Sequence, residues 1–348
     1  MVRDDLRVRL TIGFFAAVAQ FALLTAGIHA IAGPPTGDAR ILPAESSVEE
    51  LWNEGEFTEG VAVAPDGAIY FSDIPKGATP GQVLKFDPQT GETTVHCADS
   101  GKSNGLMFDR DGRLIAACGA NAGRRGLCEI TPDGEVRTLV DKFEGKPFNS
   151  PNDLVICPDG DIYFTDPRYV GAEPLELDQM SVYRYRPGIR QATRASTDIP
   201  KPNGVVCAPD GETLYVALND NGKEQLDDGT LTVRPVQMKL LACRRRADGT
   251  LGRGRVLIDF EGKFGIDGMT MDEQGHIYAA VRDADRPGIA VYTPTGKEIA
   301  YIPTSELPTN CCFGRDADAS TLYITAGGGL YRIPLKIPGY HPATAAVR

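Results

Sequence analysis

Histidine and the common catalytic motifs are scarce in this sequence. Only four histidines occur among its 348 residues, and they lie far apart: His29, His96, His276 and His341. The chain contains no HExxH pair, no paired CxxC, no phosphate-binding loop and no Gly-rich dinucleotide turn after a strand. These absences exclude the zinc-protease, nucleotide-phosphate and dinucleotide-binding functions that depend on those motifs.

Runs of basic residues are missing as well. The chain has 36 Lys and Arg against 47 Asp and Glu, which gives a formal net charge of -11 at pH 7. A polyanion would be repelled by this balance, so nucleic acid is not an expected partner. An acidic surface is otherwise ordinary for a soluble protein.

The first 32 residues differ from the rest of the chain. Arg3, Arg7 and Arg9 give a basic start, and residues 11–32 are almost free of charge and rich in Ala, Leu and Phe. Ala30-Ile31-Ala32 supplies a small-x-small cleavage pattern, so residues 1–32 are expected to be a secretory signal. The alternative is an uncleaved anchor, because the apolar stretch is long enough to span a bilayer. Both interpretations place the folded part outside the cytoplasm, in the periplasm or secreted, with no further membrane contact.

Eight cysteines in an exported chain raise the question of disulfides. Four of them lie inside apolar strand runs, where cysteine behaves as a small buried hydrophobe: Cys157, Cys207, Cys311 and Cys312. Cys118 and Cys128 flank a Gly-rich loop and could face each other across a hairpin. They are the strongest candidate for a pair.

One sequence phrase recurs six times: an apolar run, a turn with Asp and Gly, and a second apolar run rich in Ile and Tyr. The six turns are Asp66-Gly67, Asp111-Gly112, Asp159-Gly160, Asp210-Gly211, Gln274-Gly275 and Asp318-Ala319-Ser320. The five turn glycines lie 45 to 64 residues apart, and the longest interval contains a polar insertion at 219–236. A four-stranded propeller blade needs about 40–50 residues.

A second hairpin usually follows each phrase, so each repeat predicts four antiparallel strands. The expected fold is therefore all-β, a six-bladed β-propeller around a central channel that holds a metal. The last blade is one strand short, and the segment around 41–48 is expected to supply it and close the ring. The predicted organisation is a signal at 1–32, a lead-in with the closing strand at 33–50, the propeller at 51–335 and a tail at 336–348.

An oxygen-bearing side chain precedes the first strand of every repeat: Glu59, Asn104, Asn152, Asn203, Asp267 and Asn310. The first strand of a blade lines the channel, so these positions are expected to form a ring at one mouth. Asn and Asp are also ordinary turn residues, but six copies in register favour ligands. Carboxylate and amide oxygens suit calcium or magnesium better than zinc or copper. No histidine lies at these positions, so a Ser-His-Asp or Cys-His arrangement is not expected there.

Several motifs resemble those of the gluconolactonase/regucalcin (senescence marker protein) family of six-bladed propellers, and most of all its bacterial gluconolactonase-like branch. The similarity covers about residues 51–334. The motifs that carry it are Phe57–Gly60, Arg124-Arg125, Phe148–Asp153, Ile162–Tyr169, Pro202–Gly204, Asp267–Met269 and Thr309-Asn310.

This resemblance implies a single divalent cation near the centre of the channel. Its ligands would be Glu59, Asn203 and Asp267, with Asn152 as a fourth ligand or a substrate contact. Asp267 would also serve as general base or as partner of the attacking water. Substrate contacts would come from Asn104, Asn152, Arg125 and Tyr169. Calcium is the expected ion, and magnesium, manganese and zinc are the alternatives.

The expected function is thus a metal-dependent hydrolase that opens a small sugar lactone as a monomer. The metal would polarise the carbonyl group and Asp267 would assist the attacking water. Two alternatives remain open: an organophosphate or phosphoester hydrolase of the diisopropyl-fluorophosphatase type, and a non-catalytic propeller that binds calcium or another ligand.

Overall fold

The computed structural model describes residues 33–225, 231–263 and 265–345. The predicted secretory signal at 1–32 lies outside these ranges. Within them, no helix has the length and apolar character needed to cross a membrane.

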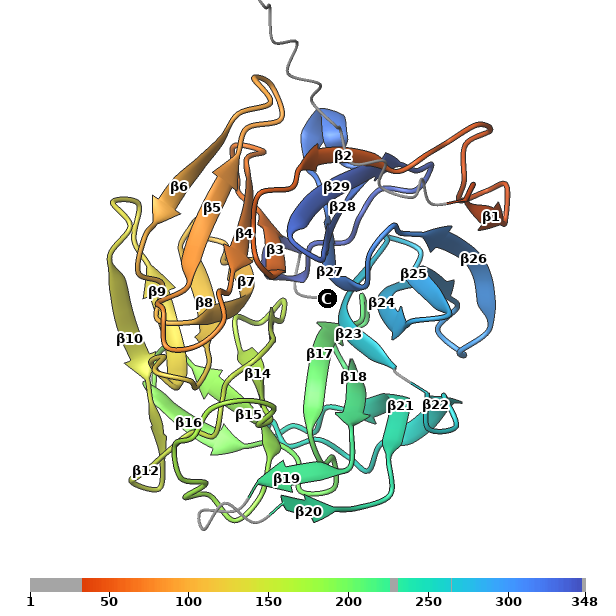
Figure 1. Ribbon diagram of the computed structural model, residues 1–348. Helices are drawn as coiled ribbons and strands as arrows, with labels where there is room; N and C mark the ends of the chain where they lie inside the picture. The colour runs from red at the N-terminus through yellow and green to blue at the C-terminus, as the bar shows by residue number, and fades with distance from the viewer. Residues whose placement is uncertain (1–32, 226–230, 264, 346–348) are drawn as a thin grey trace, which may run out of the picture. The chain divides into compact units, whose positions relative to one another are not determined.

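Six antiparallel sheets stand around one axis, as Figure 1 shows, so the prediction of an all-β six-bladed propeller is confirmed. The first blade comprises β3 (Thr58–Val63), β4 (Ile69–Asp73), β5 (Gln82–Phe86) and β6 (Thr93–Cys97). The second comprises β7 (Ser103–Phe108), β8 (Leu114–Cys118), β9 (Gly126–Ile130) and β10 (Val136–Val140). The third comprises β13 (Leu154–Ile156), β14 (Ile162–Asp166), β15 (Ser181–Arg186) and β16 (Gln191–Arg194).

The remaining blades follow the same plan. The fourth comprises β17 (Pro202–Cys207), β18 (Thr213–Asp220), β21 (Gln237–Arg244) and β22 (Arg255–Asp259). The fifth comprises β23 (Ile266–Met271), β24 (Ile277–Asp283), β25 (Arg286–Tyr292) and β26 (Glu298–Pro303), with β1 (Thr36–Gly37) at its edge. The sixth comprises β27 (Pro308–Phe313), β28 (Thr321–Ala326), β29 (Gly329–Pro334) and β2 (Glu49–Trp52).

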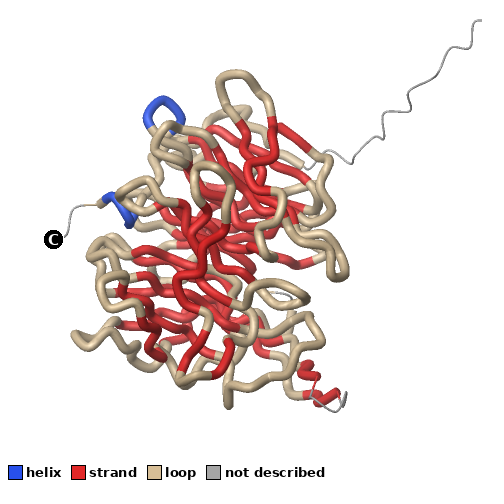
Figure 2. The backbone as a smooth tube through the Cα atoms, turned by 90° about the vertical axis from the view of Figure 1, so that its left-hand side faces the viewer, coloured by secondary structure: helices blue, strands red, loops and turns tan. Residues whose placement is uncertain are grey.

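Short elements decorate the blades. They are the hairpins β11 (Lys142–Phe143)–β12 (Lys146–Pro147) and β19 (Lys223–Gln225)–β20 (Leu231–Val233), and the 3₁₀ helices η1 (Asp316–Asp318) and η2 (Pro342–Thr344). The polar insertion of the fourth repeat contains β19 and β20. The two 3₁₀ helices lie on the same side of the strands (Figure 2).

The repeated phrase forms the inner hairpin of each blade. In the first copy Asp66 accepts a hydrogen bond from the Ala68 N–H at 3.1 Å, and Gly67 has a φ of 86°. Glycine takes this left-handed conformation without steric cost, which is why the turn retains it. The sixth copy has lost the glycine, and η1 takes the place of the tight turn.

The apolar runs are buried between adjacent blades. Six clusters of buried residues fill the spaces between successive blades, including the space between the sixth and the first. Each blade is therefore held by both of its neighbours, and the position of one inner strand depends on the next.

The ring is closed by β2, which pairs with β29 in the antiparallel register Glu49↔Arg332. This outer strand of the sixth blade lies at 49–52, so its predicted position around 41–48 is corrected. Ile41 and Leu42 instead lie in the apolar cluster between the fifth and sixth blades. Pairing the two ends of the propeller in one sheet removes an exposed edge.

The inner strands approach one another very closely at the mouth of the channel. A Cβ atom added to Gly60 would lie 1.8 Å from the Asn104 carbonyl oxygen, and one added to Gly204 would lie 2.2 Å from the Asp267 carbonyl oxygen. Register shifts occur at this level in β3, β7, β17, β23 and β27. Such irregularities redirect side chains. The glycines after the predicted ligands therefore allow close packing between blades, rather than forming simple turns.

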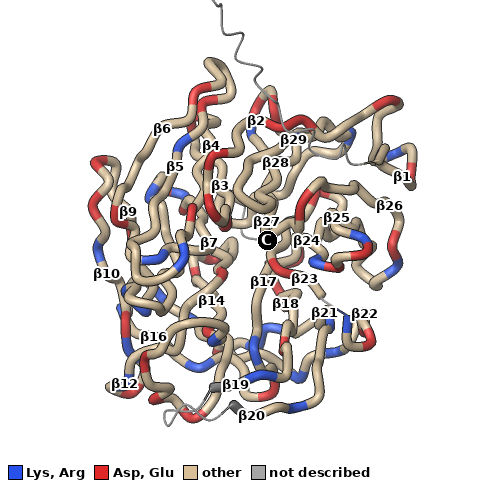
Figure 3. The backbone as a smooth tube through the Cα atoms, in the orientation of Figure 1, with Lys and Arg blue, Asp and Glu red and all other residues tan. Residues whose placement is uncertain are grey.

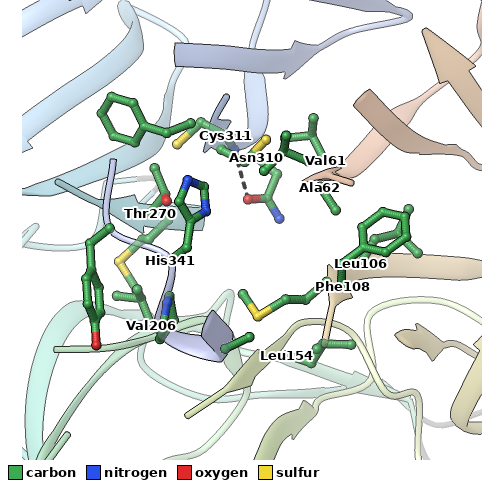
Figure 4. A pocket seen from close by; sticks show the side chains of 18 of the residues that line it. Val61, Ala62, Leu106, Phe108, Leu154, Val206, Thr270, Asn310, Cys311 and His341 are labelled. Atoms are coloured by element: carbon green, nitrogen blue, oxygen red, sulfur yellow. Dashed lines mark hydrogen bonds between the residues drawn. The ribbon is translucent and has the colours of Figure 1, made fainter. Parts of the chain in front are cut away.

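The C-terminal tail covers the opposite end of the channel. The Lys336 N–H donates to the Ile41 carbonyl at 2.9 Å, and the Tyr340 N–H donates to the Met271 carbonyl at 2.8 Å. Behind the tail lies a cavity of about 70 Å³, bordered by His341 and by the inner strands (Figure 4). The channel is therefore covered at this end by the chain itself.

Replacing Gly204 by alanine is expected to lower the free energy of unfolding by about 1–3 kcal/mol, because the new methyl group meets backbone of the next blade. The control is Gly188→Ala, since a Cβ there meets nothing within 4 Å. Chemical denaturation of both variants measures the difference. Equal stability of the two would contradict the close approach of the inner strands.

Removing residues 336–348 is expected to lower the free energy of unfolding by at least about 2 kcal/mol, because the side chain of Ile337 alone is almost fully buried. Removal of 346–348 serves as the matched control, since it leaves the described contacts of the tail intact. Thermal unfolding compares the two. If the longer truncation melts at the same temperature as the control, the tail does not stabilise the channel end.

Candidate active site

A pocket of about 530 Å³ opens at the mouth where the inner strands begin. Five of the six predicted positions line it: Glu59, Asn104, Asn152, Asn203 and Asp267. Acidic residues on β3 and β23 lie close to the channel axis (Figure 3). Side chains from five repeats, far apart in the sequence, thus meet in one place.

Asn310, the sixth position, does not line this pocket. It borders the cavity at the other end of the channel, and its Oδ1 accepts a hydrogen bond from the Cys311 N–H at 2.8 Å (Figure 4). Its side chain also forms a hydrogen bond with the carboxylate of Asp153. Among the residues that the structure describes, the ring at the mouth therefore has five members.

Two buried carboxylates dominate the electrostatics of the pocket. Glu59 is 3% exposed and Asp267 is 7% exposed. Burial raises the pKa of Glu59 well above its usual value, and the negative charge of Asp267 raises it further. Burial also raises the pKa of Asp267, whereas Arg282 and a hydrogen bond from Asn203 oppose that rise. Proximity of a positive charge would stabilise both ionised groups.

Arg282 forms an ion pair with one of these carboxylates, Asp267, in the described structure. Its Nη1 lies 3.4 Å from Asp267 Oδ2, and its guanidinium lies 5.5 Å from the centre of the Phe57 ring. The sequence interpretation missed this residue. The only signal in the sequence was its position: Arg282 lies at the end of the second strand of the fifth repeat, directly before Asp283.

The pocket can be tested for its fit to a metal ion by its donor atoms. In the described part of the chain, no three His, Cys, Asp or Glu side chains form a group that could hold a metal. A cation here would therefore depend on amide oxygens in addition to Glu59 and Asp267. Two carboxylates with neighbouring amides are hard oxygen donors, which fit calcium or magnesium.

Asn203 and Tyr169 lie around the same carboxylate. The Asn203 side chain lowers the pKa of Asp267 and that of Tyr169, because it favours the ionised form of each. The Tyr169 hydroxyl donates to the Asn219 carbonyl at 3.0 Å. Tyr169 lines the pocket, so the structure brings it together with the predicted ligands.

Arg125 lies outside the lining of the pocket. Its Nε donates to the Phe148 carbonyl at 2.7 Å, and its Nη2 donates to the Pro174 carbonyl at 3.2 Å. The guanidinium thus connects two loops of the third blade. Its predicted contact with a substrate has no counterpart in this arrangement.

Two aspartates hold the loops that lead into the inner strands. Asp166 accepts hydrogen bonds from the N–H groups of Asn149 and Ser150, at 2.9 and 2.7 Å. Burial raises the pKa of Asp166 to about 7, although these two hydrogen bonds act in the other direction. Asp73 accepts from the Phe57 N–H at 3.1 Å in the same way. The sequence interpretation missed this role, but its signal was present as an Asp that ends the Ile-Tyr-Phe strand in two repeats.

The cysteines are all free thiols in the structure. Cys118 and Cys128 both lie inside the apolar cluster between the first and second blades, where the Cys118 thiol donates to the Ser100 carbonyl at 3.4 Å and the Cys128 thiol to the Gly126 carbonyl at 3.9 Å. The strongest candidate pair of the sequence is thus adjacent but not joined.

Comparisons with known proteins agree on one family. The family model of the SMP-30/gluconolactonase/LRE-like region matches residues 57–328. A gluconolactonase of Zymomonas mobilis is 28% identical over 328 residues, covering 86% of this chain and 84% of that protein. A lactonohydrolase of Aspergillus oryzae is 26% identical over 320 residues, covering 84% of this chain and 70% of that protein.

A solved structure supports the same assignment. The gluconolactonase of Xanthomonas campestris has a TM-score of 0.72 and 28% identity, covering 87% of this chain and 95% of that one. The family model spans every blade of the propeller, from the start of the first to the sixth, and includes all five residues of the ring. The chain therefore belongs to the SMP-30/gluconolactonase/LRE-like family.

Proposed function

We propose that this protein is a gluconolactonase-like hydrolase that opens a lactone ring in the pocket at the mouth of the channel. The observation that carries the proposal is the convergence of five repeat-equivalent side chains, two of them buried carboxylates, in one pocket. The names of the two curated relatives and of the solved structure, all lactone hydrolases, support a lactone as the substrate.

The proposal includes one divalent cation held by Glu59, Asn152, Asn203 and Asp267. The buried carboxylates supply negative charge that a single arginine balances only in part. Calcium is the first choice because it accepts roughly 6–8 oxygen ligands in flexible geometry. When bound, such an ion would act as a Lewis acid on the lactone carbonyl oxygen.

The residues of the chain would divide the remaining work among them. Asp267 takes a proton from the water that adds to the carbonyl carbon, and the positive charge of Arg282 favours the ionised form of this carboxylate. Asn203 lowers the pKa of Asp267 and so favours the ionised form that accepts the proton. Asn104 and Asn152 orient the lactone ring from the sides of the pocket. The bond between the acyl carbon and the ring oxygen then breaks, and the proton goes to that oxygen, which leaves a hydroxy acid.

Export remains part of the same proposal. It rests on the basic start, apolar stretch and cleavage pattern of residues 1–32. The proposed location is the periplasm or the exterior, and the proposed form is a monomer.

Replacing Asp267 by asparagine is expected to lower kcat for D-glucono-1,5-lactone by roughly 10²–10⁴-fold, the usual contribution of a general base. Asp285→Asn removes the same charge from an exposed turn of the same blade and is the control. A pH-stat measures acid release by both variants with calcium present. Activity of the Asp267 variant equal to that of the control would remove Asp267 from the reaction.

Chelator treatment is expected to abolish lactone opening, and re-addition of one divalent ion is expected to restore it. Calcium, magnesium, manganese and zinc are added back separately, and hydrolysis is compared with the uncatalysed rate. A fluorophosphate ester in the same series tests the phosphoester alternative. If metal binds but no lactone opens faster than background, the protein is a binding propeller or a hydrolase of another class.

Glu59→Gln is expected to have opposite effects without and with metal. In the chelated protein the substitution raises the melting temperature, because it removes a buried carboxylate. Burial and the charge of Asp267 both disfavour the ionised form of that carboxylate. Saturating calcium stabilises the wild type by about 2.7 kcal/mol at 100 times Kd, and this gain shrinks in the variant. Thermal unfolding with chelator and with calcium measures both effects. An undiminished calcium effect in Glu59→Gln would exclude Glu59 as a ligand.

A further inference from the structure

The pocket is larger than its polar floor requires. Its volume of about 530 Å³ lies within the roughly 300–1,000 Å³ of pockets that bury ligands of drug size. The ring of oxygen-bearing side chains comes from the starts of the inner strands. Asn219 and Arg282 come from the ends of β18 and β24, and most of the remaining lining comes from loops that precede or follow the strands.

The loops contribute an apolar wall, defined here by Phe57, Ile74, Pro75, Ala120, Pro151 and Val170. Val170 is 64% exposed, and it is one of the exposed aliphatic side chains that lie in the lining of a pocket. Exposed apolar surface in a concave site commonly indicates a ligand that covers it.

Polar groups of the same loops are engaged within the protein. Lys102 is 3% exposed, and its ammonium group donates to the Pro75 carbonyl at 2.6 Å. The Asn121 side chain donates to the Gly77 carbonyl at 2.7 Å. The Ser150 hydroxyl accepts from the Ala120 N–H at 2.9 Å.

The rim and the far side of the pocket are more polar than the wall. Asn221 Oδ1 accepts from the Lys201 ammonium at 2.8 Å, so this amide oxygen is already engaged. Glu56 and Lys76 are exposed charged residues at the rim. The hydroxyls of a bare sugar ring would therefore find polar partners at the floor and the rim, but few along the wall.

We propose that the apolar wall is a subsite for an alkyl or aryl substituent on the lactone ring. The inference rests on the proposed lactone hydrolysis and names its substrate class: lactones whose ring lies on the polar floor and whose apolar group lies against the wall. The reaction is unchanged, since water adds to the acyl carbon and the ring ester bond breaks. The product is a hydroxy acid that carries the apolar group.

Hydrolysis of γ-alkyl-γ-butyrolactones with increasing chain length tests this proposal, with D-glucono-1,5-lactone as the unsubstituted polar reference. In the calcium-loaded wild type, kcat/KM is expected to rise up to about fourfold for each of the first added methylenes, the effect of transferring one methylene out of water. A rise with chain length that also exceeds the value for the sugar lactone supports the wall.

The wall itself is tested with Val170→Asn and Ile74→Asn, which are expected to flatten the dependence of kcat/KM on chain length. Val256→Asn, at an exposed valine of β22 that does not line the pocket, is the matched control and should keep the wild-type dependence. If the two wall variants keep it as well, the wall does not contact the substituent.

Failure of this inference can be separated from failure of the proposed function. Opening of D-glucono-1,5-lactone with no dependence on alkyl length leaves the lactonase in place and overturns the subsite. For the case that no lactone opens, calorimetry with unreactive γ-alkyl-γ-lactams measures the wall without turnover. Affinity that rises with chain length in the wild type and not in Val170→Asn supports the wall, and affinity independent of chain length overturns it.

Discussion

The close approach of the six inner strands is the constraint on which the site depends. Gly60 and Gly204 lie so near the next blade that a methyl group would meet its backbone within 2.2 Å. This spacing brings residues from separate repeats around one axis, and register shifts, which redirect side chains, occur at the same level of the inner strands. The glycines and the oxygen-bearing residues before them thus depend on each other. The glycines permit the close packing, and the packing brings the oxygen-bearing side chains together.

The same packing buries two carboxylates and so disfavours their ionisation. Glu59 and Asp267 are both removed from water, and burial raises the pKa of each. The negative charge of Asp267 raises the pKa of Glu59 further. Arg282 offsets this cost on the side of Asp267. A divalent cation would offset the cost of burying both carboxylates at once. The donor set therefore fits a hard metal better than it fits a structural ion pair with one arginine.

The sequence predicted those features that repeat. Six similar phrases specified six blades, and equivalent positions identified five side chains that the structure brings into one pocket. Asn310 shares the motif, but its oxygen is used by the Cys311 N–H, which spacing alone does not reveal. Arg282 occurs in one repeat only and therefore left no periodic signal. The closing strand β2 has only four residues, two exposed glutamates followed by the half-buried Leu51 and Trp52, which is too short to locate from an apolar run.

The two ends of the channel have different consequences for function. At one end the tail covers the channel, with the Tyr340 N–H hydrogen-bonded to the Met271 carbonyl, whereas the pocket that contains the two carboxylates opens at the mouth. At the mouth, inner strands supply the oxygen-bearing floor and loops supply the apolar wall. Loops tolerate sequence change better than packed strands do. The floor is therefore fixed by the packing of the blades, which limits the chemistry, while under the proposed subsite the loops that carry Ile74 and Val170 would determine which ring substituent the pocket accepts.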